Sequence, residues 1–97
     1  MFAVYKYPLE VADYVSLILP IGADPLTARE QNGQWFLWCL VDTQEKEMHP
    51  RHFRIAGTGH PILHDPGNLK YINTFFTHGL VWHLFEVFDA LQDHPVG

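Results

Sequence analysis

Short runs of aromatic and β-branched residues, interrupted by Pro and Gly about every 8–12 residues, constrain this chain more than any other feature. The runs that predict strands are residues 2–7, 14–19, 26–31, 34–41, 51–56, 71–76 and 80–88. Asn32-Gly33 is the clearest turn signal, because a type I′ hairpin turn requires positive φ at both central residues. The pattern predicts a mainly β fold, either a small antiparallel β-sandwich or a partly open barrel of about 6–7 strands.

The composition supports a chain that folds around a core of its own. Apolar residues make up 47% of the 97 residues, and the aromatics include three Trp, four Tyr and seven Phe. Disordered chains contain few aromatic residues, and no apolar run here approaches the length of a transmembrane helix. We therefore expect one small β domain over residues 1–97, with no membrane span.

The charge balance bears on partners and location. Six Lys and Arg against eleven Asp and Glu give a net charge of -5, whereas nucleic-acid binding requires clustered basic residues. No direct sequence-specific nucleic-acid binding is expected. A lone Cys39 excludes an internal disulfide, and the chain opens without a signal-peptide pattern, so we expect a cytoplasmic protein.

Two segments deserve separate predictions. Residues 34–41 are apolar on both faces, which predicts a central strand with an inert, buried Cys39. In residues 80–93, the polar side chains of His83, Glu86, Asp89 and Asp93 recur at a helical period, but the aromatic and β-branched content favours a strand. We favour a strand through Glu86, which a short helical turn could follow. A helix would instead place Glu86 on a solvated stripe.

No set of residues indicates catalysis or metal binding. The pairs His49/His52 and His60/His64 have ligand-like spacings, but a metal site needs three or four converging ligands. Solvated loop histidines are the simpler interpretation. The HExxH and GxSxG motifs are both missing from the sequence. We therefore expect a protein that is not an enzyme and needs no metal or cofactor.

The best local candidate for a ligand site is the segment Gly57-Thr58-Gly59-His60. Two glycines let backbone N–H groups approach a ligand closely. Thr58 adds a hydroxyl, His60 adds a titratable donor, and Arg54 upstream adds a cation that could meet a phosphate or carboxylate. The competing interpretation is a turn at the end of a strand that needs glycine only for its backbone conformation.

The aromatic residues point to a surface that meets a partner. A sheet domain of this size covers only one face of each sheet, and an exposed cluster of aromatics is costly. A homodimer or another protein partner would cover the remainder. The candidate interface residues are Trp35, Trp82, His83, Phe85 and, in the polar segment 42–50, Glu45 and Glu47. A satisfied core position remains the alternative for His83.

Six blocks of the sequence, spread over residues 4–86, resemble a family of small uncharacterised proteins encoded by bacteriophages and prophages. The blocks are VYKYPL at 4–9, LPIGA at 19–23, NGQ at 32–34 with LW and LVD, FRIAGTGHPI at 53–62, YINTF at 71–75 and LVWHLFE at 80–86.

The resemblance implies a phage setting and no particular chemistry. In that setting, a small acidic protein without catalytic residues is expected to bind and block a bacterial antiviral defence component, such as a CRISPR effector complex. One alternative is an oligomeric sponge for a nucleotide-like immune signal, held by the 57–60 segment, Arg54 and an aromatic such as Trp35 or Tyr71. Another is a virion-associated structural accessory protein.

Overall fold

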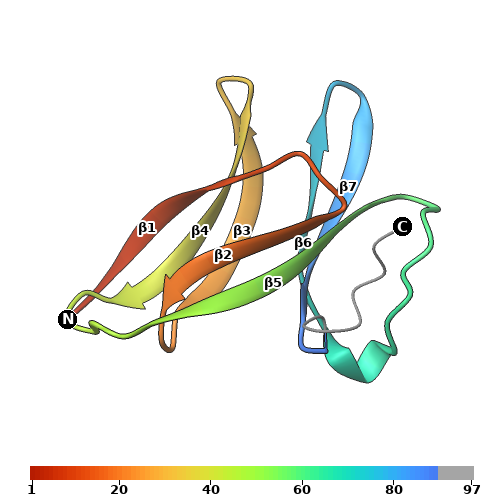
Figure 1. The fold of residues 1–97 in the computed structure, drawn as a ribbon. Helices are drawn as coiled ribbons and strands as arrows, with labels where there is room; N and C mark the ends of the chain where they lie inside the picture. Colours follow the sequence, from red (N-terminus) through yellow and green to blue (C-terminus); the bar gives the residue numbers. More distant parts are fainter. Residues whose placement is uncertain (90–97) are drawn as a thin grey trace.

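A computed structural model of the chain describes residues 1–89 and consists of strands with a single short 3-10 turn (Figure 1). The elements are β1 (Phe2–Leu9), β2 (Tyr14–Pro20), β3 (Asp24–Gln31), β4 (Gln34–Asp42), β5 (Met48–Gly57), η1 (Pro66–Asn68), β6 (Leu69–Thr77) and β7 (Leu80–Val87). Within the described residues, no helix is long and apolar enough to cross a membrane.

The strands form two antiparallel sheets, with the orders β1-β4-β3 and β2-β5-β7-β6. The predicted mainly β, sandwich-like fold is confirmed, and the sheets do not close into a barrel. Strand β4 is central in its sheet, as its two apolar faces predicted. Asn32 and Gly33 form the β3–β4 turn with φ values of 54° and 83°.

The ambiguous segment near the C-terminus is a strand. β7 runs from Leu80 to Val87 and pairs with both β5 and β6, so it is interior to the four-stranded sheet. This position explains its aromatic and β-branched content, because an interior strand meets side chains from both neighbours. The helical turn that could follow falls mainly on residues 90–93, which lie outside the described part.

The side chain of Asn73 helps to join the two sheets along one side. The register of β6 shifts between Tyr71 and Asn73, and the Asn73 amide faces the edge of β3. Its Oδ1 accepts a hydrogen bond from the Ala28 N–H at 2.8 Å, and its Nδ2 donates one to the Ala28 carbonyl at 2.8 Å. Asn73 thus stands in for a strand partner, and the β3–β4 and β6–β7 hairpins lie side by side (Figure 1).

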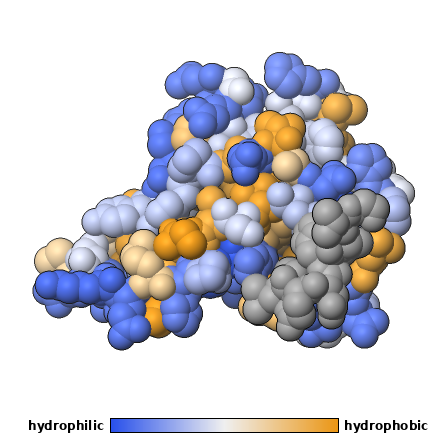
Figure 2. Space-filling model, in the orientation of Figure 1, coloured by the Kyte–Doolittle hydropathy of each residue, from blue (hydrophilic) through white to orange (hydrophobic). Residues whose placement is uncertain are grey.

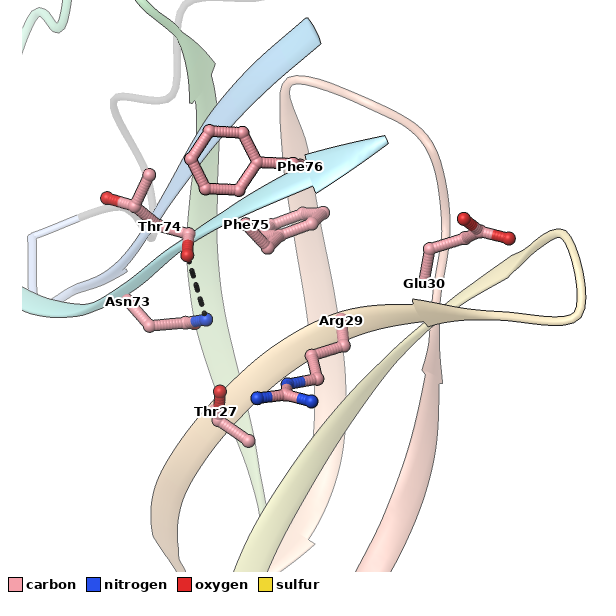
Figure 3. A pocket seen from close by; sticks show the side chains of 7 residues that line it. All are labelled: Thr27, Arg29, Glu30, Asn73, Thr74, Phe75 and Phe76. Atoms are coloured by element: carbon pink, nitrogen blue, oxygen red, sulfur yellow. Dashed lines mark hydrogen bonds between the residues drawn. The ribbon is translucent and has the colours of Figure 1, made fainter. Parts of the chain in front are cut away.

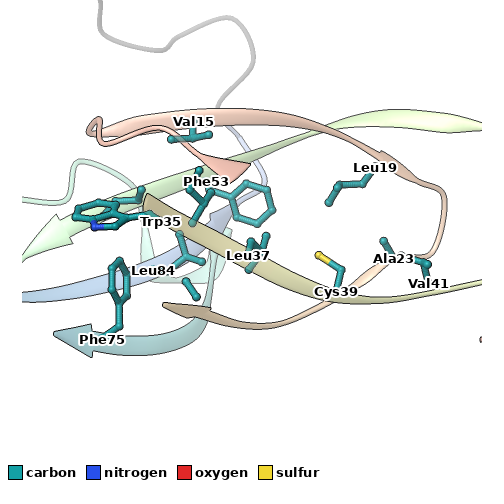
Figure 4. Close-up of a cluster of buried hydrophobic side chains, with 13 residues drawn as sticks. Val15, Leu19, Ala23, Trp35, Leu37, Cys39, Val41, Phe53, Phe75 and Leu84 are labelled. Atoms are coloured by element: carbon teal, nitrogen blue, oxygen red, sulfur yellow. The ribbon is translucent and has the colours of Figure 1, made fainter. Parts of the chain in front are cut away.

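The core lies between the sheets and follows the alternation of β4. Trp35, Leu37, Cys39 and Val41 point inward and are buried, while the residues between them point outward. They meet inward side chains of the second sheet, among which Phe53 and Leu84 are fully buried (Figure 4). Burial raises the pKa of the Cys39 thiol to about 12.

An ion pair occupies the end of this core. Arg51 of β5 binds both carboxylate oxygens of Glu86 on β7 and donates a further hydrogen bond to the Ala23 carbonyl at 2.9 Å. The Glu86 side chain is only 3% exposed. Glu86 is therefore buried and paired, and a solvated stripe is wrong for this residue. The hydrogen bond to Glu86 raises the pKa of Arg51, so the guanidinium stays charged.

Replacing Glu86 should destabilise the protein far more than replacing a surface partner. Glu86→Gln leaves the Arg51 charge in the core without its counter-ion, and we expect a loss of about 3–5 kcal/mol. Lys70→Met removes an exposed pair with Asp24, 3.8 Å apart, and should cost less than about 1 kcal/mol. Urea unfolding of both variants measures the difference, and equal losses would show that the core pair contributes no more than a surface one.

Cys39 should be unreactive until the protein unfolds. At pH 8 a thiol with a pKa near 12 carries almost no thiolate, and Cys39 is fully buried. Labelling with a thiol-specific disulfide reagent should be at least 100-fold slower in buffer than in 8 M urea. Equal rates in the two conditions would place Cys39 outside the core.

Candidate functional site

The predicted loop is a tight turn that ends β5. The His60 N–H donates to the Gly57 carbonyl at 3.0 Å, and the Gly57 N–H donates to His60 Nδ1 at 3.2 Å. A Cβ on Gly57 would lie 2.8 Å from His60 Cε1, and Gly59 has a φ of 89°. Both glycines are thus explained by the geometry of the 57–60 turn itself, whatever else the turn binds.

A pocket of about 380 Å³ lies between the 57–60 turn and the β6–β7 turn. Gly57, Thr58, His60 and Trp82, all singled out from the sequence, line it together with Gly79, Leu80 and Val81. The His60 ring meets the Trp82 indole edge-on, with ring centroids 6.2 Å apart. The Trp82 Nε1–H is buried and has no hydrogen-bond partner among the described residues. The pocket therefore offers an apolar floor that includes the Trp82 side chain, whose Nε1–H is itself buried.

Arg54 does not supply the cation expected in this pocket. Its side chain is 6% exposed, and its guanidinium donates to the carbonyls of Asp13, Ile55 and Pro61 at 3.3, 2.9 and 2.8 Å. It also stacks over Tyr14 at 5.2 Å. The expected anion-binding role of Arg54 is wrong for this structure, because these carbonyls occupy the guanidinium. Arg54 instead fastens the chain after the 57–60 turn onto the sheet.

Gly59 and Trp35 also lie outside the sites predicted for them. Gly59 is exposed in the turn and is not part of the pocket lining. Trp35 is 5% exposed and packs against Phe75 and Trp82 with centroids 5.1 and 5.3 Å apart. Trp35 is therefore a core residue, and the expectation that it forms an interface or stacks on a ligand is wrong.

The other interface candidates lie at or near the surface. Phe85 is half-buried and packs edge-on against exposed Tyr71, with centroids 5.6 Å apart. Glu45 and Glu47 lie in the β4–β5 loop, where the Glu45 carboxylate accepts a hydrogen bond from the Glu47 N–H at 3.0 Å. Glu47 is exposed, while Glu45 is half-buried. Their carboxylates are therefore presented at one end of the three-stranded sheet.

His83 is one of four hydrogen-bonded side chains on the outer face of the second sheet. Its Nε2 lies 2.8 Å from the Thr58 hydroxyl, and its Nδ1 lies 2.9 Å from the Thr74 hydroxyl. The Tyr71 hydroxyl lies 2.7 Å from the same Thr74 hydroxyl. Both ring nitrogens are therefore satisfied, and His83 orients the Thr58 hydroxyl at the rim of the pocket. Only the strand register, which pairs Thr74 with His83, could have indicated this set of hydrogen bonds.

The remaining histidines do not converge. The sequence predicted that His64 is a solvated loop residue, and this is wrong. Its side chain is 7% exposed and contacts the Tyr14 hydroxyl and Asp89 at 3.1 and 2.8 Å. His52 Nδ1 lies 2.9 Å from the Ser16 hydroxyl. Among residues 1–89, no group of three or more His, Cys, Asp or Glu is placed to hold a metal ion.

A second surface was only partly visible in the sequence: the outer face of the three-stranded sheet. Phe36 and Trp38 of β4 pack together here, with centroids 5.9 Å apart, and the Lys6 ammonium sits 4.4 Å above Phe36. The register adds the directly opposed pair Leu40 and Val4, 36% and 53% exposed. Within the described residues, Phe36 and Trp38 are half-buried, and Val4 and Leu40 are exposed. Figure 2 shows, from one side, hydrophobic surface interspersed with hydrophilic side chains.

Comparison with known proteins identifies a family. A family model described as "Domain of unknown function (DUF7352)" matches residues 1–93. The chain belongs to this family. No curated protein and no solved structure matches it. Both sheets, the pocket and the outer face of this DUF7352 protein lie inside the matched range.

The contact between Gly57 and His60 predicts a non-additive pair of substitutions. Gly57→Ala forces the His60 ring away and should lower the free energy of unfolding by about 1–3 kcal/mol. In a His60→Ala background the added methyl has space, so Gly57→Ala should cost less than about 0.5 kcal/mol there. Urea unfolding of the four proteins measures the coupling, and a full Gly57→Ala penalty in both backgrounds would contradict the geometry.

Proposed function

We propose that this DUF7352 protein is a non-enzymatic accessory protein that binds and blocks a bacterial antiviral defence component in the cytoplasm. A CRISPR effector complex is the form of partner we put first, and direct protein–protein contact is the mode of inhibition. The phage setting rests on the six sequence blocks at residues 4–86. The observation that carries the binding role is the outer face of the three-stranded sheet.

That face has the composition of a protein-binding surface. Aromatic residues are enriched in protein interfaces and supply most of their energy. Phe36 and Trp38 form such a centre, and exposed Phe2, Val4 and Leu40 extend it along the strands. An apolar surface of this kind is costly when solvated, so a partner that covers it gains binding energy.

The acidic residues favour a partner with a complementary charge. The net charge of -5 and the exposed Glu47 favour a partner with a basic surface, such as a nucleic-acid channel. Asp42 lies opposite Phe2 on the same face, and the loop carrying Glu45 and Glu47 follows it directly. Charges at the rim of an interface speed association and select partners more than they add affinity. Binding should therefore weaken as salt increases.

A second copy of the chain is a further proposed partner. Strand β1 pairs on one side only, and the exposed Phe2 and Val4 lie along it. Sedimentation velocity distinguishes a homodimer from the 11.2 kDa monomer. A homodimer would cover part of the surface that we assign to the defence component.

The nucleotide sponge is the second candidate function. The pocket beside the 57–60 turn favours it, because Trp82 and His60 place planar rings in its lining. Arg54 gives it no support, since its guanidinium is engaged by carbonyls. For a virion-associated role, the surface formed by residues 1–89 offers no distinguishing feature.

A charge on the outer face should weaken inhibition. We would express the protein in bacteria with defined CRISPR systems and challenge them with a targeted phage. The wild-type protein should raise the plating efficiency of the phage. Val4→Asp should give a plating efficiency at least 10-fold lower than the wild-type protein does, as expected for an interface anchor. Leu63→Asp, at an exposed site on the 58–65 segment, should inhibit like wild type.

The controls separate binding from folding. Val4→Asp and Leu63→Asp must both match the wild-type unfolding midpoint in urea. Wild-type inhibition that survives Val4→Asp would contradict the assigned face, and the lack of inhibition of every system tested would contradict the proposed function.

A further inference from the structure

A second cavity, separate from the 57–60 turn, lies where β3 and β6 run side by side. It has a volume of about 420 Å³ and is lined from β3 by Thr27, Arg29 and Glu30 and from β6 by Thr74 and Phe76, among others (Figure 3). The Asn73 bridge to Ala28 forms its base by holding the two strands together. A cavity of this size falls within the range of small-molecule sites.

Arg29 is the free cation of this cavity. The other two arginines are held inside the fold, Arg51 by Glu86 and Arg54 by backbone carbonyls. The Arg29 side chain is exposed, and within residues 1–89 it makes no hydrogen bond or ion pair. A guanidinium that is not consumed by the protein suits a phosphate or carboxylate, which it can bind through two parallel N–H groups.

Phe76 supplies a planar surface on the opposite wall. It is 70% exposed, although it sits within the paired part of β6. Its neighbour Phe75 is buried against Trp35, so the core accounts for one of these two rings and not for the other. Exposed aromatic rings bind the flat faces of nucleobases, at a gain of about 1–3 kcal/mol per base.

Glu30 completes the set with an acceptor. Its Oε2 accepts a hydrogen bond from the Gly33 N–H at 2.7 Å, which fixes the carboxylate. Its Oε1 is 3.5 Å from the Thr77 hydroxyl, at the limit of a hydrogen bond. This oxygen can therefore accept a stronger bond from a hydroxyl or amino group of a ligand.

We propose that the β3–β6 cavity binds a mononucleotide-sized aromatic anion. The base stacks on Phe76, the phosphate pairs with Arg29, and Glu30 accepts a hydrogen bond from the sugar or base. One free arginine and a net charge of -5 suit a small ligand and oppose binding of long nucleic acid. This site is separate from the pocket beside the 57–60 turn. It adjoins the outer face of the three-stranded sheet, because Arg29 lies directly opposite Phe36.

Calorimetric titration with AMP, GMP, CMP and UMP tests the site, with adenosine and inorganic phosphate as partial ligands. At least one mononucleotide should bind, at least 10-fold more tightly than either partial ligand. Arg29→Met and Phe76→Ala should each weaken that binding at least 10-fold. Lys46→Met and Phe2→Ala, at an exposed lysine and a similarly exposed phenylalanine elsewhere, should bind as wild type does.

Three results would overturn the proposal: no binding of any of the four mononucleotides at millimolar concentration, equal binding of adenosine or phosphate alone, or unchanged affinity in Arg29→Met. Each variant must retain the wild-type unfolding midpoint. Inhibition of a defence system is read separately with Val4→Asp, so failure of this site leaves that result unaffected.

Discussion

The ion pair of Arg51 and Glu86 is the constraint on which the arrangement of the two sheets depends. A charge buried at the end of a core is tolerated only when it is paired and fully hydrogen-bonded. Arg51 meets that requirement by joining β5 to β7 and by reaching the Ala23 carbonyl just before β3. Through Ala23 and, by the Asn73 bridge, Ala28, polar groups of the second sheet hold β3 in place over the shared apolar core.

With the inward faces fixed, the alternation of each strand determines the surface. The side chains of β4 that do not enter the core emerge on the outer face of the three-stranded sheet, where Phe36 and Trp38 meet Lys6. The second sheet has a different outer face, because Arg54 and the chain after the 57–60 turn cover part of it. The three-stranded sheet thus presents the packed pair Phe36 and Trp38, whereas the second sheet exposes Tyr71 and Phe76 on β6.

The sequence predicted well what depends on neighbouring residues and poorly what depends on distant ones. The strand runs, the Asn32-Gly33 turn and the central position of β4 follow from local alternation and turn chemistry. Glu86 finds its partner 35 residues away, and the carbonyls that occupy Arg54 include one 41 residues away, so no local pattern reveals either. The cavity of Arg29 and Phe76 was also missed, because its walls come from β3 and β6, which are distant in sequence and adjacent only in the fold. In the pocket beside the 57–60 turn, the sequence singled out the neighbouring residues Gly57, Thr58 and His60 but gave no sign of Gly79, Leu80 and Val81 on the facing turn.

We propose above all that the outer face of the three-stranded sheet contacts a defence protein. Photo-crosslinking tests it most directly, with a photoreactive phenylalanine analogue at position 40 on that face or at position 63 away from it. In cells whose defence is inhibited, position 40 should crosslink to a subunit of the defence complex, identified by mass spectrometry, and position 63 should not. A crosslink to that subunit from position 63 alone would contradict the claim.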